Sequence, residues 1–199
     1  MAIQPSESTE NRPAGALNSL ALAEYRELRA TIRERGSLRH IVVLITFSVW
    51  TATMLWAAST FSVPLFLLIP LVVLVAGFEV SFALHVAVER VGRFIQVRYE
   101  RESGTAVSWE HTAMALRVPG GGVDPLFLNV FLVAATLSLL TGVWVSPITH
   151  GSPDAGFQQV ELAVFAAAHT AAIVRWISAG RYARSQRVRE LSAFEELLR

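Results

Sequence analysis

Four long apolar stretches separate the polar parts of this chain. They cover residues 41–59, 63–89, 125–146 and 159–178. A helix needs about 20 apolar residues to cross a hydrocarbon core of about 30 Å, and each stretch is near or above that length. The first contains no charged residue, and in the third Asn129 is the one strongly polar side chain. The pattern predicts an all-α fold, a transmembrane four-helix bundle.

The second and fourth stretches depart from a plain spanning helix. The second opens at Pro64 and continues through Pro70, whose missing N–H predicts a kink. Its length exceeds the hydrocarbon core by roughly 10 Å, so we expect it to project into the cytoplasm. In the fourth, Glu161 and Arg175 bracket the apolar part. Both side chains can reach an interface, so this stretch is also expected to span.

An amphipathic cytoplasmic helix is predicted before the first stretch, over residues 17–36. Its apolar side chains recur at helical spacing: Ala21, Tyr25, Leu28 and Ile32. Gly36 is expected to end it. Residues 1–16 carry acidic and turn-forming residues where a secretory signal has a basic stretch and an apolar run, so they are predicted to be a disordered tail.

A second amphipathic cytoplasmic helix is predicted at residues 179–199. Its apolar side chains are expected on one side: Val188, Leu191, Phe194 and Leu198. We expect the two amphipathic helices to pack on each other or on lipid headgroups. A dedicated lipid- or protein-recruiting surface is the alternative.

Arginine is distributed unequally between the two sides of the predicted membrane. Clusters precede residue 41, follow residue 89 and follow residue 178, whereas the other two connections contain none. Basic residues accumulate on the cytoplasmic side of membrane proteins. Both termini and the segment 90–124 are therefore predicted to be cytoplasmic, with residues 37–178 as the four-span membrane domain.

Composition supports a membrane protein and excludes several other classes. The chain is 53% hydrophobic and 17% charged, which is too apolar for an ordinary soluble domain. A net charge of +1 gives no general attraction to nucleic acid. The chain has no cysteine, so disulfides and thiolate metal sites are excluded. Arginine without lysine, together with abundant alanine, suggests a GC-rich bacterial genome and thus a bacterial cytoplasmic membrane.

Polar residues inside the apolar stretches are the candidates for function, because they are costly in a bilayer. Ser81, His85, Glu89 and Arg93 recur every four residues along one side of the second stretch. In the favoured interpretation Glu79 and His169 satisfy each other or hydroxyls such as those of Thr51 and Thr136, and Glu89 pairs with Arg93. The alternative is an ion or proton path formed by four residues: Glu79, His85, Glu89 and His169.

Two further alternatives involve a cofactor, although the favoured interpretation has none. Haem could be held between His85 and His169 if these lie on facing helices. A divalent metal in a hydrolase or oxidase could be bound by four residues near one interface: His85, Glu89, Glu110 and His111. The glycine-rich turn at residues 119–122 lacks the lysine of a phosphate-binding loop, which argues against nucleotide binding.

Small residues indicate where helices can approach closely. Gly92 lets another helix pack against the end of the second stretch, and Ala163, Ala167 and Ala171 form a stripe on the fourth. The leading hypothesis is a non-enzymatic membrane module that binds a partner or forms a homo-oligomer. An ion- or proton-conducting oligomer is the second hypothesis, and a haem- or metal-binding membrane protein is the third.

Three segments resemble a group of small four-span bacterial membrane proteins with no established activity. They are EYRELRATIRERG at residues 24–36, HVAVERVGRFIQVRYE at 85–100 and SWEH at 108–111. Similar proteins combine an arginine-rich entry helix with an H-x-x-x-x-x-x-G-x-[YF]-I stretch at the end of a transmembrane helix. The resemblance implies the four-span architecture and supplies no activity.

Overall fold

The computed structural model describes residues 14–61, 63–100, 125–145 and 155–198. All regular structure in these residues is helical, which confirms the all-α prediction for the described part of the chain. The elements are α1 (Ala14–Thr60), the 3-10 turn η1 (Pro64–Leu67), α2 (Leu68–Ile95), the π-helical turn η2 (Gln96–Glu100), α4 (Pro125–Val145) and α5 (Ala155–Leu197).

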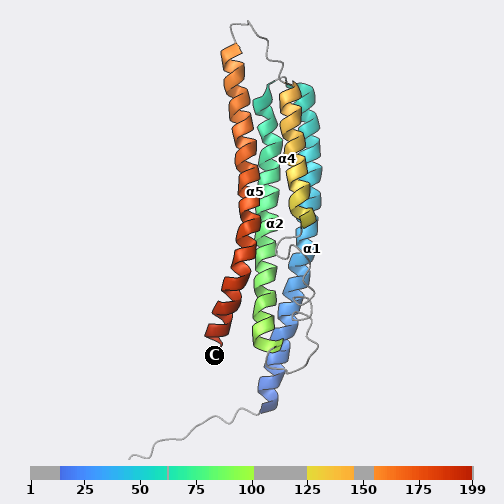
Figure 1. The fold of residues 1–199 in the computed structure, drawn as a ribbon. Helices are drawn as coiled ribbons and strands as arrows, with labels where there is room; N and C mark the ends of the chain where they lie inside the picture. The colour runs from blue at the N-terminus through green and yellow to red at the C-terminus, as the bar shows by residue number, and fades with distance from the viewer. Residues whose placement is uncertain (1–13, 62, 101–124, 146–154, 199) are drawn as a thin grey trace, which may run out of the picture.

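The four α-helices lie alongside one another and alternate in direction (Figure 1). Helix α2 packs against α1, α4 and α5, so it occupies the centre of the arrangement. The start of α1 and the end of α5 lie at the same end of the molecule (Figure 1). We call this the charged end and define it as residues 19–40, 85–99 and 179–198.

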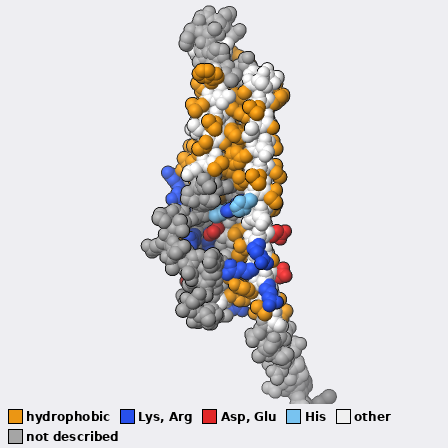
Figure 2. Space-filling model, turned by 90° about the vertical axis from the view of Figure 1, so that its right-hand side faces the viewer, with side chains coloured by type: hydrophobic (Ala, Val, Ile, Leu, Met, Phe, Trp, Pro, Cys, Tyr) orange, Lys and Arg blue, Asp and Glu red, His pale blue; other side chains and the backbone are white. Residues whose placement is uncertain are grey.

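Three helical stretches in the described residues are long and apolar enough to cross a membrane: Ser19–Thr60, Pro64–Tyr99 and Gly156–Leu197. Leu128–Trp144, inside α4, is a shorter apolar helix. Figure 2 shows one face of the molecule, on which hydrophobic side chains cover the upper part and arginine and acidic side chains gather below. An outer surface of this kind is compatible with a membrane protein.

Helix α1 continues through Gly36, so our expectation that this residue ends a separate helix was wrong. The helix has 47 residues and is about 70 Å long at 1.5 Å per residue. Contacts to the α2 segment hold it on both sides of the glycine: the rings of Tyr25 and Tyr99 meet edge to face, and Arg39 reaches His85. These contacts outweigh the penalty of about 1 kcal/mol for glycine inside a helix.

The second apolar stretch begins with a 3-10 turn, and α2 starts at Leu68. Pro70 therefore lies in the first turn of α2, where its missing N–H leaves no hydrogen bond unmade. The irregularity that we expected as a kink at Pro70 is instead the junction between η1 and α2. Helical structure continues beyond the predicted stretch, through Ile95 and η2 to Glu100, and the projection of this end into the cytoplasm stays a prediction.

Two hydrophobic clusters fill the interior between the helices. The larger contains Phe78, Phe131 and Trp176, whose ring centroids lie 5.2–5.7 Å apart. The smaller contains Met54, Ala57, Leu67 and Phe165 and lies nearer the end opposite the charged end. The central rings are 0–1% exposed, so side chains occupy the axis of the molecule.

Two glycines allow the closest helix contacts. A Cβ atom at Gly77 would overlap the side chain of Thr46, where α2 crosses α1. A Cβ atom at Gly142 would overlap the ring of Phe165, where α4 meets α5. Small residues serve this purpose at helix crossings in membranes, where backbones must approach closely.

Candidate functional site

An ion-pair cluster joins α2 to α5 at the charged end. Glu190 accepts a hydrogen bond from Arg90 Nε at 3.0 Å and also binds Arg93 and Gln186. Arg93 reaches Glu89 on its own helix at 3.4 Å, which confirms the predicted Glu89–Arg93 pair. The cluster ties the end of α2 to the last part of α5.

The side chain of Glu190 is 16% exposed and that of Arg93 is 7% exposed. Burial by itself raises the pKa of the Glu190 carboxyl, but hydrogen bonds from Gln186, Arg90 and Arg93 outweigh it, and the pKa falls below its ordinary value of 4.5. The carboxylate is therefore ionised at neutral pH and compensates the buried Arg93 guanidinium. Such a pair is costly to break, because one partner alone leaves an uncompensated charge.

The polar stripe on α2 faces inward. Ser81, His85 and Arg93 are buried, and Glu89 is half-buried. Arg39 of α1 lies 2.9 Å from His85 Nδ1. A guanidinium group only donates, so this nitrogen accepts and the proton of the neutral imidazole is on Nε2. The arrangement makes His85 a contact between α1 and α2.

Glu79 pairs with Arg175 of α5, with Oε2 and Nη2 2.7 Å apart. The two side chains are 39% and 49% exposed, so the pair lies on the outer surface of the molecule. The expectation that Glu79 and His169 satisfy each other or nearby threonines was wrong. The hydroxyls of Thr51 and Thr136 donate to carbonyl groups of their own helices instead.

Trp50, Ser138 and His169 introduce polar groups into the middle of the interior. We call these three residues the polar layer. Trp50 Nε1 donates to Ser138 Oγ at 3.0 Å, which joins α1 to α4. His169 is fully buried, and its Nδ1 lies 3.0 Å from the carbonyl oxygen of Phe165. That contact places the proton on Nδ1 and leaves Nε2 without a hydrogen-bond partner among the described residues.

The antiparallel register of α4 and α5 brings Ser138 level with His169. Gly142 meets Phe165, and Phe131 meets Trp176. Counting inward from these contacts places Ser138 opposite His169 on the neighbouring helix. The layer lies between the two hydrophobic clusters, so apolar side chains separate it from both ends of the molecule.

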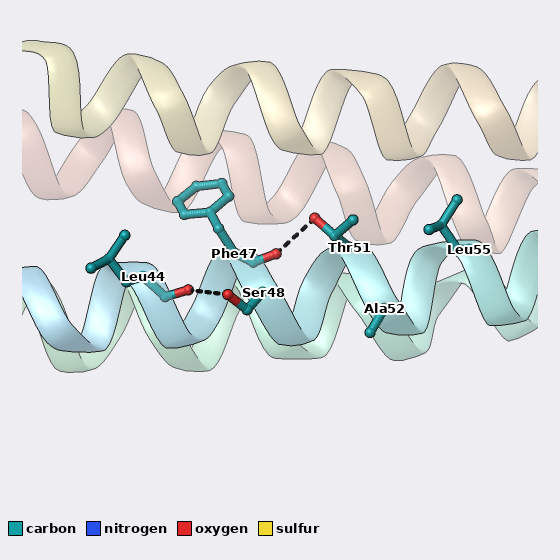
Figure 3. Close-up of a pocket in the computed structure, with 6 residues that line it drawn as sticks. All are labelled: Leu44, Phe47, Ser48, Thr51, Ala52 and Leu55. Atoms are coloured by element: carbon teal, nitrogen blue, oxygen red, sulfur yellow. Dashed lines mark hydrogen bonds between the residues drawn. The ribbon is translucent and has the colours of Figure 1, made fainter.

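A shallow open groove with a volume of about 570 Å³ runs along the outer side of α1 (Figure 3). It is lined by Leu44, Phe47, Ser48, Thr51, Ala52 and Leu55. The hydroxyls of Ser48 and Thr51 donate to the carbonyl groups of Leu44 and Phe47. Because it contains no ionisable side chain and its hydroxyls are already bonded, the groove offers nothing for acid–base or nucleophilic catalysis.

The predicted metal and haem ligands are not brought together in the part of the chain that the structure describes. Glu110 and His111 lie outside the described residues. Within them, no group of three or more His, Cys, Asp or Glu side chains could hold a metal ion. The two proposed haem ligands, His85 and His169, have separate partners on α1 and α5.

The small residues proposed for close packing have different surroundings. Gly92 is half-buried, in agreement with a helix packed near it. Ala163, Ala167 and Ala171 are exposed, so this stripe is not buried between helices of the described chain.

Comparison of the chain with protein-family models, with curated proteins and with solved structures finds no match. Function must therefore be inferred from the geometry alone.

Several partners of the polar residues were not identified from the sequence. Arg39, Arg175 and Glu190 each bind a side chain on another helix, and Ser138 accepts from Trp50. The arginines carried a signal, because their clusters in the sequence mark the charged end of the molecule. Their pairing depends on the register between helices distant in sequence, which composition does not reveal.

Proposed function

We propose that the protein is a non-enzymatic integral membrane module that crosses the bilayer four times. Its charged end would engage a partner protein or another copy on the cytoplasmic side. The observation that carries the proposal is the separation of surfaces along the helices: exposed apolar side chains cover one part, and most charged side chains gather in the other (Figure 2). An outer surface with this division matches a hydrocarbon core and the water beside it.

The length of α4 supports a fourth crossing. The helix has 21 residues, or about 31 Å at 1.5 Å per residue, against a hydrocarbon core of about 30 Å. It packs against α1, α2 and α5, which include the three candidate spans. A helix of this length and apolarity beside three spanning helices would cross with them.

The charged end would form a stiff extension of the membrane part. Helices α1 and α5 pass without a break from their apolar to their charged segments. The rings of Phe94 and Phe194 meet at 5.7 Å, and the Arg90–Glu190 pair lies nearby. A partner bound at this end would therefore be held at a fixed position relative to the membrane. This property suits a scaffold better than a catalyst.

Single-cysteine labelling tests the topology, and the absence of native cysteine makes it simple. Cysteine is placed at Ser19, Ser59 or Ser192, all of which are exposed. In sealed membrane vesicles, an impermeant maleimide should modify positions 19 and 192 from one side and position 59 from the other. Labelling of position 59 from the same side as position 19, labelling of positions 19 and 192 from opposite sides, or release of the protein by an alkaline wash would refute the four-crossing module.

The second candidate function is an ion- or proton-conducting oligomer. The observation in its favour is that the Glu79–Arg175 pair and the alanine stripe both lie on the outer surface. A path using Glu79 would then run between subunits, since apolar side chains fill the interior of one chain. Purified protein in liposomes should leave the membrane electrically tight. An ion flux that Glu79→Gln abolishes would refute the non-conducting module and support the channel.

A further inference from the structure

The outward side of α5 carries arginine without acidic neighbours just beyond the apolar part. From Arg175 to Arg189 the sequence contains five arginines and no aspartate or glutamate. Ala179, Ala183 and Gln186 face the interior, whereas Arg181, Arg184 and Arg189 are exposed. We call these three exposed residues the arginine face. By comparison, the charged segment of α1 alternates arginine with glutamate.

Within the arginine face, the guanidinium groups differ in how far they are already bonded. Arg189 donates to Ser185 and lies over the ring of Tyr182. Arg184 uses Nε to donate to the carbonyl of Gly180, and its two terminal nitrogens have no partner among the described residues. Arg181 has no hydrogen bond or ion pair in the described part of the chain. Arg181 and Arg184 are three residues apart, so they are neighbours on the helix surface.

The level of these residues along the molecule is fixed by contacts of α2. The pairs Glu79–Arg175 and Arg93–Glu190 set α2 and α5 parallel, in a register that puts Arg181 within one residue of the level of His85. His85 meets Arg39 of α1, which immediately precedes the long apolar stretch of that helix. Arg181 and Arg184 therefore lie at the border between the apolar part and the charged end.

Above this border, the same outward side of α5 is apolar. Val160, Val164, Val174 and Ile177 are all exposed there. In the proposed membrane module these side chains would contact acyl chains, and a headgroup beside them would lie against the arginines. Guanidinium groups bind phosphate through paired hydrogen bonds, and basic side chains at a membrane surface attract anionic lipids.

We propose that Arg181 and Arg184 form a binding site for the phosphate of an anionic phospholipid. The lipid lies along α5, with its acyl chains against the exposed Val174 and Ile177 and its phosphodiester between the two guanidinium groups. The site rests on the proposed membrane function and adds a lipid preference to it. Charge complementarity selects the anionic headgroup, because no carboxylate on this stretch of α5 competes for the arginines.

Native mass spectrometry of the full chain in detergent micelles tests the site. Dioleoyl phosphatidylglycerol and dioleoyl phosphatidylcholine are titrated separately against three proteins: wild type, R181Q/R184Q and the control R26Q/R33Q. The control removes the same charge from exposed positions in the mixed-charge segment of α1. Each basic residue near a charged surface contributes about fivefold to binding, so the R181Q/R184Q variant should lose about 25-fold in affinity for phosphatidylglycerol.

The expected result is a wild-type preference for phosphatidylglycerol that falls in R181Q/R184Q and persists in R26Q/R33Q. Equal losses in the two variants, or an unchanged preference in R181Q/R184Q, would overturn the proposed site. Excess inorganic phosphate should not displace the lipid, and displacement would overturn the assignment to a phospholipid. A protein that passes the cysteine-labelling test but shows no lipid preference retains the membrane proposal and loses only this site.

Discussion

Adding one methyl group at Gly77 tests whether α1 and α2 are held as closely as the structure has them. A Cβ atom there would overlap the Cβ, Cγ2 and Oγ1 atoms of Thr46. The threonine is buried, and its hydroxyl donates to the carbonyl of Val42 at 2.7 Å. Rotation away from the new methyl group would break that hydrogen bond. The overlap must therefore be relieved by separating the helices.

Two opposing effects set the magnitude for Gly77→Ala. Alanine is favoured over glycine inside a helix by about 1 kcal/mol. Overpacking a close contact costs about 1–3 kcal/mol. We expect the free energy of unfolding to fall by about 1–2 kcal/mol, because the overlap involves three side-chain atoms of a buried, hydrogen-bonded residue.

Gly36→Ala is the matched control, because it makes the same chemical change in α1 at a site with no atom within 4 Å of the added Cβ. Only the helix preference acts there, so stability should rise by up to about 1 kcal/mol. The free energies are measured by denaturant titration in mixed micelles. Replacing Thr46 by alanine in the Gly77→Ala background should recover part of the loss, because two of the three overlapping atoms are removed and Cβ remains. If Gly77→Ala stabilised the protein as Gly36→Ala does, the close α1–α2 packing would be incorrect.

Two further predictions concern buried polar groups. Ser138→Ala leaves Trp50 Nε1 without its acceptor and should lower the free energy of unfolding by about 1 kcal/mol. The control Ser48→Ala, at an exposed position, should change it by less than about 0.5 kcal/mol. Equal effects of the two substitutions in denaturant titrations would contradict the polar layer. The pKa of Glu190 is lowered in the folded state, so its stabilising contribution is present above its ordinary value of 4.5 and is lost as the pH falls through the folded pKa. Thermal unfolding of the wild type at decreasing pH should show this loss of stability. Glu190→Gln should lack the part of the loss that comes from Glu190, and Glu196→Gln, at an exposed position, should retain it. The same pH dependence in Glu190→Gln as in the wild type would contradict the assigned role of Glu190.

The existence of the apolar helices was predictable because the signal is local. A stretch such as residues 41–59 has no charge and is long enough to span, and no distant residue is needed to recognise it. Helix continuity was less predictable. Glycine often ends a helix, but contacts from α2 and η2 on either side of Gly36 keep α1 helical. The prediction for the end of α5 was also partly wrong. Val188, which was expected on the apolar side of this segment, is 71% exposed, and Glu190 faces α2 instead.

The pairing of polar residues could be predicted only within one helix. Glu89 and Arg93 are four residues apart, so helical geometry alone brings them together, and this pair was identified. Arg175 lies 96 positions after its partner Glu79. Their contact depends on the parallel register of α2 and α5, which is set by side-chain packing between the helices. The sequence therefore identified which polar residues were candidates, but it did not identify which residues on other helices they contact.

The depth of each polar group within the proposed membrane is consistent with its charge. The neutral polar layer lies near the middle of the apolar part, and the buried ion pairs lie at the charged end. The Glu79–Arg175 pair lies between them: Arg175 is six residues beyond His169 on α5, or about 9 Å along the helix. A half-core of about 15 Å then leaves roughly 6 Å to the headgroups, a distance that an arginine side chain can cover by snorkelling.

This depth explains why an outward-facing carboxylate is tolerated on α2. Glu79 alone would be costly at that position, but Arg175 compensates its charge at 2.7 Å while extending toward the headgroups. The pair therefore needs no ion path to account for it. If Glu79 also conducts ions, a second subunit must cover the pair, because within one chain it faces outward and the polar layer is closed off by apolar clusters. A variant that prevents oligomerisation must accordingly also abolish any ion flux that depends on Glu79.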